Sequence, residues 1–466
     1  MWVSSRNGGS VMSQLLSVIL AAGKGTRMKS LQPKVLHRVG GKTMVQHVLD
    51  AAKKAGAERS VVVIGFGAES VATALGDQAE FVVQAEQLGT GHAVMQAREL
   101  LADFEGTVMV LCGDTPLLRS ELLAKLYAEH LQSQAAATVL TAHMPDPTGY
   151  GRVIRNSDGQ VVKIVEHKDA TPEERLVTEV NTGIYCFERA ALFHALAGLN
   201  CNNVQGEYYL TDVISILASN HTKVWATPAE DFQETFGINS RAQLAEAEKI
   251  LRKRKALELM DSGVTIMDAD STFIDADVTI GADTIIYPFT WIEGATTIGS
   301  GCEIGPNTRL QNTVIGDNVT LHFVYAHECQ IADQVTVGPY VHLRPGTALA
   351  SGVKVGNFVE VKNSQIGESS KIPHLSYIGD TDMGQKVNIG SGTITVNYDG
   401  KHKHRTTIED GAFIGCNTNL VAPVTVGEGA YVAAGSTITK DVPATSLGVA
   451  RARQSNIEGW VNKRKG

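Results

Sequence analysis

A glycine-rich and basic segment, Gly23-Lys24-Gly25-Thr26-Arg27, is the first part of the sequence whose residue types and spacing could do chemistry. It closely follows a short apolar run, Leu16–Ala21, that has the composition of a buried strand. Glycines let backbone N–H groups approach phosphate oxygens, and the charges of Lys24, Arg27 and the nearby Lys34 add attraction. The segment therefore predicts a site for a phosphorylated ligand.

Two common phosphate-binding motifs do not explain this segment. The dinucleotide fingerprint requires a third glycine, and Met28 stands at that position. The stretch Gly40-Gly41-Lys42-Thr43 lacks the earlier glycine of a P-loop, because Leu36 replaces it. The plainer alternatives are that the glycines form only a tight turn and that Lys34 is a solvated surface charge.

A second candidate group is Asp114, which follows the hydrophobic run Val108–Leu111. A carboxylate at the carboxyl end of a strand can hold Mg²⁺, an ion that usually takes only one or two protein carboxylates and keeps several waters. The sequence therefore predicts a magnesium ligand at Asp114.

The elements that must position these residues alternate between short strands and helices. Strand patterns cover Leu16–Ala21, Ser60–Ile64, Glu80–Val83 and Thr107–Leu111, and helical patterns cover Lys42–Lys54, Gly91–Leu101 and Ser120–Gln132. This alternation predicts an α/β, Rossmann-like domain with a mostly parallel sheet and helices on both faces. In such sheets ligands bind at the carboxyl ends of the strands, where the glycine segment and Asp114 both lie.

Beyond Gly263 the hydrophobic period changes to six residues. Inward-facing aliphatic residues are expected at Ile280, Ile286, Ile292, Ile298, Ile304, Leu310, Val337, Leu343, Leu349, Val355, Val361, Ile366, Ile372, Ile378, Ile414, Leu420, Val426, Val432 and Ile438. Neither a helix nor an ordinary strand has this period, whereas a left-handed parallel β-helix built from hexapeptide repeats does.

Two segments connect or interrupt these patterns. The stretch from Asn239 to about Asp261 predicts one helix, with Ser240 and Gln243 spaced as a capping box and Gly263 as its stop. The stretch 397–405 carries no inward aliphatic residue and should leave the β-helix as a loop, which is either inert or part of a site.

Composition narrows the classes of protein further. The 466 residues include 41 Lys and Arg against 49 Asp and Glu, a net charge of −8 that argues against a nucleic-acid binder. Six scattered cysteines predict free thiols of a reducing compartment. No apolar run reaches the ~18 residues of a membrane span, and residues 1–17 do not have the pattern of a signal peptide. We expect a cytoplasmic enzyme without membrane insertion, whose translation start is either Met1 or Met12.

Further segments give the sequence a specific resemblance. They are Leu20–Met28 with Pro33-Lys34, Gln84–Gly91, Gly113-Asp114, Gly149–Arg152, Val165–Lys168 and Asn181–Gly183, in this order along the chain. The first segments resemble the sugar-1-phosphate nucleotidyltransferases. Together with the hexapeptide repeats, the chain from Leu16 to Trp460 resembles the bacterial bifunctional N-acetylglucosamine-1-phosphate uridylyltransferases and glucosamine-1-phosphate acetyltransferases.

The resemblance implies two reactions. Acetyl-CoA acetylates glucosamine-1-phosphate, and UTP then donates UMP to N-acetylglucosamine-1-phosphate, which gives UDP-N-acetylglucosamine and pyrophosphate for cell-wall and lipopolysaccharide precursors. It implies a flexible extension over residues 1–15, a uridylyltransferase domain over 16–238, a linker helix over 239–262 and an acetyltransferase β-helix over 263–466. It also implies a homotrimer with acetyl-transfer sites between subunits.

Residues of the first half take their roles from this resemblance. Arg27 and Lys34 are implied to act on the phosphates, and Asp114 with Asn239 to hold Mg²⁺, although Asn239 can also be read as a residue at the start of the linker helix. The implied substrate-binding residues are Leu20, Ala21, Ala22, Gly23, Lys34, Gln84, Gly89, Thr90, Gly151, Glu166, Asn181 and Asn239. Of these, Gln84, Gly89 and Thr90 face uracil, and Gly151, Glu166 and Asn181 hold the sugar. Cys112 stands where tyrosine is familiar in the family.

In the second half, His374 is implied to be the base that takes a proton from the sugar amine. A histidine is suited to this near neutral pH. Arg344 and Lys362 are implied to bind the sugar phosphate, and Tyr377 and Asn388 the sugar. The implied acetyl-CoA contacts are Ser391, Asn397, Tyr398, Cys416, Ala434 and Arg451, with Ser391 and Cys416 replacing the familiar Ala and Ser.

Two other functions stay open on the sequence. The β-helix could serve only assembly or regulation in a nucleotidyltransferase, or the whole chain could be a trimeric scaffold with a degenerate catalytic half. Acetyl-CoA-dependent acetylation and UTP-dependent pyrophosphate release discriminate among the three.

Overall fold

The computed structural model describes residues 14–464, so most of the extension expected over residues 1–15 lies outside the described residues. Strand β1 already begins at Gln14. The chain forms two compact units that divide between Leu251 and Arg252. Among residues 14–464, no helix combines the length and the apolar content that crossing a bilayer requires.

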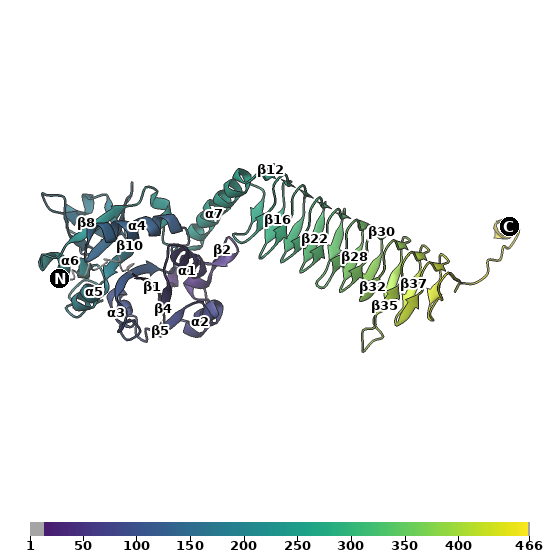
Figure 1. Ribbon diagram of the computed structural model, residues 1–466, viewed down its shortest axis with the longest axis horizontal. Coiled ribbons are helices and arrows are strands. Elements are labelled where there is room, and N and C mark those ends of the chain that lie inside the picture. Colours follow the sequence, from purple (N-terminus) through teal and green to yellow (C-terminus); the bar gives the residue numbers. More distant parts are fainter. Residues whose placement is uncertain (1–13, 465–466) are drawn as a thin grey trace, which may run out of the picture. The chain divides into compact units, whose positions relative to one another are not determined.

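The first unit is built around a nine-stranded sheet (Figure 1). Its main path runs β11 (Val224–Pro228), β7 (Ala137–His143), β10 (Glu179–Glu188), β6 (Gly106–Cys112), β1 (Gln14–Ala21), β4 (Arg59–Ile64) and β5 (Glu80–Val83), while β8 (Arg152–Arg155) and β9 (Val161–Val165) extend from β10. Strand β1 pairs in parallel with both β4 and β6, and β10 runs antiparallel to β6. A separate two-stranded ribbon joins β2 (Arg38–Val39) and β3 (Lys42–Thr43).

Helices cover both faces of this sheet, as the alternating pattern predicts. They are α1 (Met44–Lys54), α2 (Ala68–Leu75), α3 (Thr90–Met95), α4 (Ser120–Ser133), α5 (Arg189–Leu196) and α6 (Asp212–Ser219), with short 3₁₀ turns η1 (Thr26–Met28), η2 (Lys34–Leu36), η3 (Gly76–Gln78), η4 (Glu174–Leu176) and η5 (Phe232–Thr235). Alternate residues of β1 belong to two different hydrophobic clusters, for example Val18 to one and Ile19 to the other. The central strands are therefore apolar on both faces, which is why they read as continuous apolar runs.

One predicted helix is shorter than expected. The pattern over Gly91–Leu101 predicts a single helix, but α3 ends at Met95 and the chain continues in turns. The N–H groups of Gln96 and Ala97 bond to carbonyls three residues back rather than four. Apolar side chains at Ala97 and Leu101 remain fully buried, so the pattern predicted their burial correctly but not their backbone.

Helix α7 (Arg241–Asp261) contains the division between the two units. The Ser240 hydroxyl accepts a hydrogen bond from the Gln243 N–H at 3.2 Å, as the capping pattern predicts, and the Gln243 amide oxygen accepts from the Asn239 N–H at 2.7 Å. Ala247 packs in a cluster of the first unit, whereas Ala256 and Leu259 pack in the core of the second. Each half of α7 is thus fixed by its own unit.

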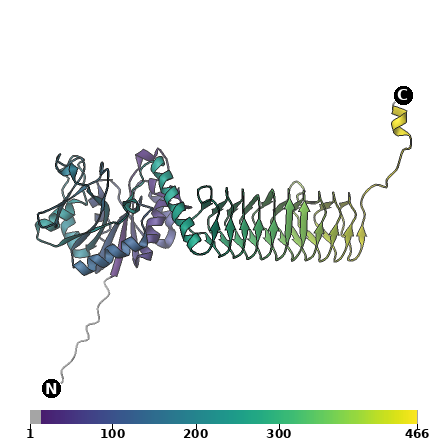
Figure 2. The same cartoon turned by 90° about the horizontal axis from the view of Figure 1, so that it is seen from above.

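The second unit is a left-handed parallel β-helix whose coils stack one upon the next (Figure 2). The first of its three sheets contains β12 (Thr265–Ile266), β15 (Ile285–Ile286), β18 (Glu303–Ile304), β21 (Thr320–Leu321), β24 (Thr336–Val337), β27 (Lys354–Asn357), β30 (Lys371–His374), β33 (Asn388–Ile389), β36 (Phe413–Ile414), β39 (Tyr431–Val432) and β41 (Leu447–Gly448). The second contains β13 (Phe273–Ile274), β16 (Trp291–Glu293), β19 (Arg309–Gln311), β22 (Val324–His327), β25 (Val341–Leu343), β28 (Glu360–Lys362), β31 (Tyr377–Gly379), β34 (Ile394–Val396), β37 (Asn419–Val421) and β40 (Thr437–Ile438). The third contains β14 (Thr279–Ile280), β17 (Thr297–Ile298), β20 (Val314–Ile315), β23 (Gln330–Ile331), β26 (Ala348–Leu349), β29 (Gln365–Ile366), β32 (Thr381–Met383), β35 (Thr406–Ile408) and β38 (Val424–Val426). A short helix, α8 (Trp460–Arg464), lies near the end of the described chain.

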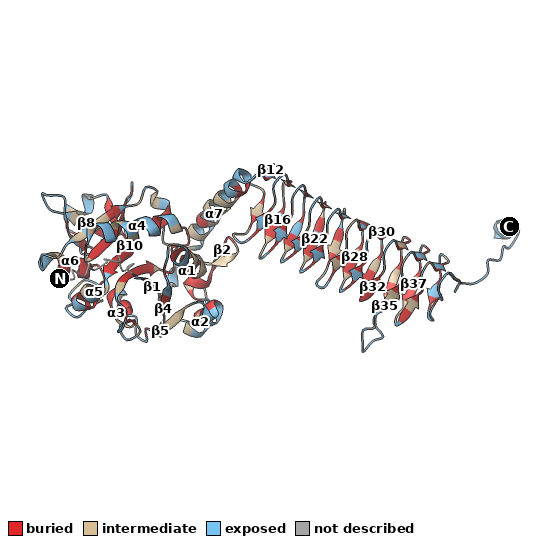
Figure 3. Ribbon diagram, in the orientation of Figure 1, coloured by how far each residue is buried: buried red, intermediate tan, exposed pale blue. Residues whose placement is uncertain are grey.

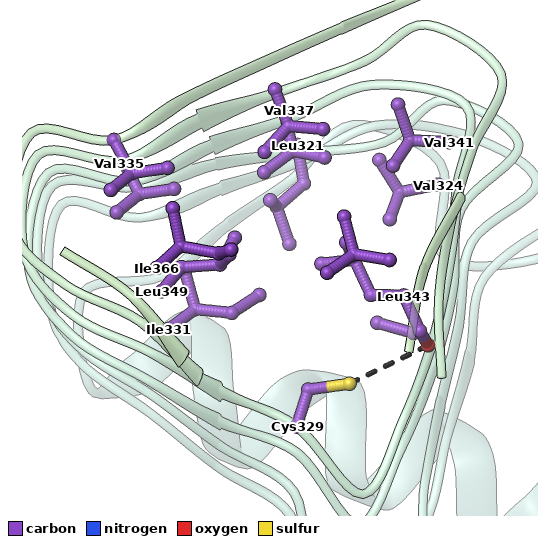
Figure 4. Packing of buried hydrophobic residues seen from close by; sticks show 14 of the residues in the cluster. Leu321, Val324, Cys329, Ile331, Val335, Val337, Val341, Leu343, Leu349 and Ile366 are labelled. Atoms are coloured by element: carbon purple, nitrogen blue, oxygen red, sulfur yellow. Dashed lines mark hydrogen bonds between the residues drawn. The ribbon is translucent and has the colours of Figure 1, made fainter. Parts of the chain in front are cut away.

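The core of the β-helix consists of the aliphatic residues that recur every six positions. Every residue predicted to face inward is buried and belongs to one continuous cluster (Figure 3). Figure 4 shows Leu321, Leu343 and Leu349 pointing from the three sheets into this interior, with the Cys329 thiol close to the Leu343 carbonyl. Because each coil buries its aliphatic residues against its neighbours, no single coil has a core of its own.

One loop leaves the stack where the repeat is interrupted, as predicted for 397–405 (Figure 1). Residues that pair between successive coils of the third sheet are 17 positions apart at Gln365 and Asp382, but 25 apart at Asp382 and Thr407. The additional residues form a narrow hairpin closed by a bridge between Tyr398 and Lys403. The stacking resumes after it without a change of register.

Candidate active sites

The glycine segment forms an open turn at the carboxyl end of β1. Gly25 adopts a left-handed conformation with φ of 58°, and a Cβ there would lie 2.5 Å from the Lys34 Cβ, so only glycine fits. Leu20 lies beside the turn, and its carbonyl accepts a hydrogen bond from the Gly113 N–H at 2.9 Å. Within residues 14–464, the exposed side chains of Lys24 and Arg27 form no hydrogen bond or ion pair. Two uncompensated cations therefore face solvent beside the turn.

Lys34, Asp114 and Asn239 converge in the same unit although they lie far apart in the sequence. The Lys34 ammonium group donates to the Asp114 carboxylate and, at 3.0 Å, to the Asn239 amide oxygen. The backbone holds this geometry, because the Ile238 N–H donates to the Asp114 carbonyl at 2.8 Å. Two oxygen ligands and one positive charge thus meet at one point beneath the glycine segment.

Cys112 lies beside this group as a neutral thiol. Burial raises its pKa to about 12, the Asp114 charge adds to this effect, and the Lys34 charge opposes it. The thiol donates to the Gly183 carbonyl at 3.5 Å, a weak interaction. Cys112 therefore fills space here rather than supplying a strong donor.

The three predicted sugar residues meet at one end of the β8–β9–β10 junction. Arg152 pairs with Val165 on β9 and with Val180 on β10, so the neighbouring Gly151, Glu166 and Asn181 lie together. The Asn181 N–H donates to the Gly151 carbonyl at 2.9 Å.

Glu166 is a largely buried carboxylate in this group. Burial raises its pKa, the nearby carboxylates of Asp169 and Asp212 add to this, and a 3.3 Å bond from the Thr211 hydroxyl acts in the opposite direction. A ligand hydroxyl that donates a hydrogen bond to a carboxylate in this setting stabilises its charged form.

The predicted uracil residues also lie together. The Gln84 amide, 3% exposed, donates to the Gly89 carbonyl at 3.1 Å and contacts the His92 ring nitrogen at 3.0 Å. A Cβ at Gly89 would lie 2.6 Å from the Tyr208 carbonyl, so glycine is required for this close approach. The Thr90 hydroxyl accepts from the Leu210 N–H at 3.1 Å.

His374 projects from the β-helix at the end of β30. Its Nδ1 lies 2.8 Å from the Asn357 amide oxygen on the preceding coil. Since a carbonyl oxygen only accepts, Nδ1 is assigned as the protonated nitrogen, and Nε2 keeps its lone pair. The side chain is exposed, so Nε2 is available as a base.

Two positive groups lie at the ends of strands of the second sheet, one and two coils before the coil that carries His374. Arg344 follows β25 and donates to Glu360 at 2.8 Å. Lys362 ends β28, with its ammonium group 3.7 Å from the Asp380 carboxylate. Tyr377, the first residue of β31, pairs with Glu360 on the coil before it.

Three predicted acetyl-CoA residues form a column along one corner of the β-helix. The Asn417 N–H donates to the Ser391 carbonyl at 2.7 Å, and the Gly435 N–H donates to the Cys416 carbonyl at 2.8 Å. Ala434 occupies the same position on the next coil, and Arg451 follows on the coil after it. Asn388 lies on the strand that leads into this corner.

The predicted loop residues differ in burial. Asn397 is buried and its amide contacts the Tyr377 hydroxyl at 3.4 Å. Tyr398 is exposed at the base of the hairpin. The predicted residues as a whole fall into two groups, one in each compact unit.

The comparisons with known proteins agree with this division. The family described as nucleotidyl transferase matches residues 16–238, and the bacterial transferase hexapeptide family (six repeats) matches residues 405–440. Bifunctional protein GlmU of a Geobacillus species (strain WCH70) is 56% identical over 97% of this chain and 98% of its own length. Bifunctional protein GlmU of Heliobacterium modesticaldum is 55% identical over 97% of this chain and 99% of its own length.

The chain belongs to the bifunctional GlmU family. It is a transferase with a nucleotidyltransferase domain and a hexapeptide acetyltransferase domain, which confirms the family, fold class and enzyme class predicted from the motifs. A solved structure of UDP-glucose pyrophosphorylase complexed with UDP-glucose aligns at a TM-score of 0.43 and 18% identity, over 52% of this chain and 99% of that chain, which is too remote to carry an argument.

Within this GlmU-family chain, the structure adds residues that sequence reasoning missed. His92 contacts Gln84, the segment Glu207–Asp212 lies against Gly89 and Glu166, and Lys403 approaches Lys362 from the hairpin. No spacing pattern marks them, because they reach the sites through contacts between distant segments. Only Lys403 had a signal in the sequence. It lies in the Lys- and His-rich run 401–404, and such a basic hairpin leaving the β-helix could have been expected to place its charge near another element.

Proposed function

We propose that the chain acetylates glucosamine-1-phosphate with acetyl-CoA and then transfers UMP from UTP to N-acetylglucosamine-1-phosphate, giving UDP-N-acetylglucosamine and pyrophosphate. The observation that carries this proposal is the pair of separate clusters, Lys34 with Asp114 and Asn239 in one unit and His374 with Asn357 in the other. We assign uridylyl transfer to residues 16–238, acetyl transfer to 263–466, and a connecting role to 239–262.

The oxygens of Asp114 and Asn239 fit a magnesium ion. Both face the Lys34 ammonium group, so they already converge on one positively charged point, and oxygen ligands are those Mg²⁺ prefers. When bound, Mg²⁺ would offset charge on the UTP phosphates. The Lys34 ammonium would supply further positive charge beside the ion, and the backbone bond between Ile238 and Asp114 keeps the two oxygens together.

The chain's own residues then orient the two anionic reactants. The backbone turn of Leu20, Ala21, Ala22 and Gly23, with Arg27 at its exposed end, receives the triphosphate. Gln84, Gly89 and Thr90 read the uracil, since amide and backbone groups match its donors and acceptors. Gly151, Glu166 and Asn181 hold the sugar, whose hydroxyls donate to the Glu166 carboxylate. This places the sugar phosphate oxygen in line with the α-phosphorus while pyrophosphate leaves.

Acetyl transfer requires an unprotonated sugar amine. His374 Nε2 takes the proton as the amine nitrogen bonds to the acetyl carbon, and the thioester carbon–sulfur bond breaks to release CoA. The Asn357 amide keeps the proton on Nδ1 and so fixes the orientation of the ring. Arg344 and Lys362 bind the sugar phosphate, since a guanidinium fork and a point charge both suit it, and Tyr377 and Asn388 bind the sugar.

Acetyl-CoA lies along the corner column of the β-helix. Ser391, Cys416 and Ala434 offer small side chains and exposed backbone there, Arg451 adds a charge, and Asn397 with Tyr398 approaches from the hairpin. The acetyl group would then enter beside His374, two coils before Cys416 in the same column.

We also propose that the chain forms a homotrimer in the cytoplasm, with acetyl-transfer sites between subunits. The support is an aromatic ladder of Phe323, Tyr340 and Phe358, whose successive ring centroids lie 5.2 and 5.4 Å apart along a corner of the β-helix, with the Tyr340 and Phe358 rings stacked. Tyr340 and Phe358 are 57% and 56% exposed in the single chain. A row of exposed rings of this kind is typical of a protein interface.

The first experiment supplies the purified protein with glucosamine-1-phosphate, acetyl-CoA, UTP and Mg²⁺, and measures free CoA and pyrophosphate separately. Release of both, with UDP-N-acetylglucosamine formed, is expected. Pyrophosphate released only from added N-acetylglucosamine-1-phosphate, without any CoA, would reduce the β-helix to a scaffold and overturn the acetyltransferase assignment.

A further inference from the structure

Asp380 is a buried carboxylate at the base of the hairpin that the proposed mechanism does not use. Its residue is 5% exposed, and its backbone is left-handed with φ of 50°. Asn312 and Asn363 occupy the same corner on earlier coils with φ of 48° and 45°. Asparagine can therefore adopt the left-handed backbone of this corner without a charge. The backbone conformation does not explain why a buried carboxylate stands at Asp380.

The side chain of Asp380 contacts three residues, two on the coil before it and one on the coil after it. One carboxylate oxygen accepts from the Asn363 amide at 2.6 Å, and the other accepts from the Asn397 amide. The second oxygen also lies 3.7 Å from the Lys362 ammonium group. One group thus contacts a residue assigned to the sugar phosphate and a residue assigned to acetyl-CoA.

The backbone of Asp380 strengthens the same connection. Its N–H donates to the Lys362 carbonyl at 2.9 Å, and its carbonyl accepts from the Thr406 N–H at 3.1 Å. Since Asn397 begins the hairpin and Thr406 directly follows it, Asp380 holds both ends of the hairpin. The two ends are also joined to each other by the His404 N–H, which donates to the Asn397 carbonyl at 2.8 Å.

The charges around Asp380 favour its ionised form. Burial acts to raise its pKa, but the bonds from Asn363 and Asn397 and the charges of Lys362 and Lys403 outweigh burial and lower the pKa. Lys362 in turn lowers the pKa of Lys403, because the two ammonium groups lie close together. One carboxylate beside two ammonium groups keeps them near each other and leaves this group with a net positive charge.

We propose that Asp380 is a positioning residue that sets Lys362 and Asn397 together, so that one buried carboxylate aligns the sugar-phosphate side and the acetyl-CoA side of the acetyl-transfer site. This inference rests on the acetyltransferase function proposed above. In this arrangement the binding of both substrates depends on one side chain that contacts neither of them.

The test substitutes Asp380→Asn and measures the KM for each substrate of acetyl transfer. We expect both KM values to rise about tenfold, which corresponds to the loss of one charge-assisted hydrogen bond. The matched control is Asp382→Asn, because Asp382 lies only two residues further along, on β32, and forms an ion pair with Arg405 at the end of the hairpin. We expect that control to change either KM less than twofold, and uridylyl transfer to be unchanged in both variants.

A second variant removes the same contact without altering the corner. Asn397→Ser takes away the bond to Asp380 and is expected to raise the KM for glucosamine-1-phosphate severalfold, although Asn397 lies on the acetyl-CoA side. Adding Asp380→Asn to Asn397→Ser should then raise the KM for acetyl-CoA no further. If Asp380 only stabilised the fold, its substitution would lower the melting temperature and kcat. It would not make a change at Asn397 raise the KM for glucosamine-1-phosphate, and the effects of the two substitutions on the KM for acetyl-CoA would add.

Three outcomes would overturn the inference. They are KM values within twofold of the wild type in Asp380→Asn, equal effects of Asp380→Asn and Asp382→Asn, and full additivity in the double variant. If Lys362→Ala and Asn397→Ala both left acetyl transfer intact, the proposed function itself would fail instead. The two failures are therefore distinguishable.

Discussion

A single ammonium group, Lys34 Nζ, joins parts of the first unit that are 80 and 205 positions away in the sequence. Two oxygen acceptors and one cation in a partly buried place interact more strongly than on an open surface. Removing one of the three side chains leaves the charge or hydrogen-bonding group of the others without a partner in this partly buried place. We therefore expect the group at Asp114 to be the part of the proposed uridylyl site that is most sensitive to substitution.

We expect Asp114→Asn to lower uridylyl transfer about 100-fold or more, because a neutral amide holds a divalent cation far more weakly than a carboxylate. Acetyl transfer should be unchanged, since its residues lie in the other unit. The measurement is the rate of pyrophosphate release and the rate of CoA release on the same preparation. Asp158→Asn, at an exposed carboxylate of the β8–β9 turn, is the control and should change neither rate. Equal loss of both activities would contradict independent sites.

The six thiols should differ sharply in reactivity. Cys201 and Cys416 are exposed, whereas Cys186, Cys302 and Cys329 are buried. With a pKa of about 12, Cys112 stays protonated at pH 8 and lacks the reactive thiolate. We expect iodoacetamide to label only Cys201 and Cys416 in the folded protein, as read by mass spectrometry. Acetyl-CoA should protect Cys416 and not Cys201, and equal labelling of Cys416 with and without acetyl-CoA would remove it from the proposed column.

At the residue scale, the sequence could predict the groups that lie next to a strand end or within a recognisable motif. Asp114 directly follows an apolar run, and His374 stands in a segment that resembles a catalytic one. Asp380 and Lys403 could not be predicted in this way, since their importance comes from contacts across coils 17 to 41 residues apart in sequence. A spacing pattern carries no information about which side chains of stacked coils meet.

At the scale of the elements, the β-helix depends on one inward aliphatic residue per short strand. Ile378 is fully buried between Val361 on the coil before and the coils that follow. Its strand also carries Tyr377, and Asp380 follows two residues later. Packing at this position therefore supports the residues of the proposed acetyl-transfer site.

We expect Ile378→Ala to lower the free energy of unfolding of the β-helix by about 2–5 kcal/mol, through lost apolar burial and the cavity left behind. Val314→Ala, at a residue of the same β-helix that is 54% exposed, should change it by less than about 0.5 kcal/mol. Denaturant unfolding of both variants measures the difference. Similar values for the two variants would show that the inward column does not carry the stability of the coils.

The elements were predictable wherever one period dominated. Every position that the six-residue repeat predicted to face inward is buried, because each short strand has one inward place for an aliphatic side chain, but inward residues at the phase slips, such as Leu321 and Ile331, were not predicted. The helix expected over Gly91–Leu101 was wrong beyond Met95, since apolar spacing reports burial and does not distinguish a helix from successive tight turns. The hairpin at 397–405 was predictable as a departure, but its contacts with Asp380 were not.

At the scale of the whole molecule, the two sets of site residues fall in different compact units. Helix α7 belongs to both, with Ala247 packed in one core and Leu259 in the other. Neither of the two proposed sites includes a residue of the other unit. Substitutions that disturb assembly of the β-helix should therefore affect acetyl transfer and leave uridylyl transfer intact.

The proposed trimer gives this expectation its most direct test. Tyr340→Asp combined with Phe358→Asp places two charges on the exposed aromatic ladder, where burial in an interface would require their desolvation. We expect the wild type to sediment as a trimer and the double variant as a monomer that has lost acetyl transfer and kept uridylyl transfer. Trp225→Asp, at an exposed indole of the first unit, should leave the trimer intact. A wild-type monomer with full acetyl transfer would contradict sites shared between subunits, and a double variant that stays trimeric would place the interface elsewhere on the β-helix.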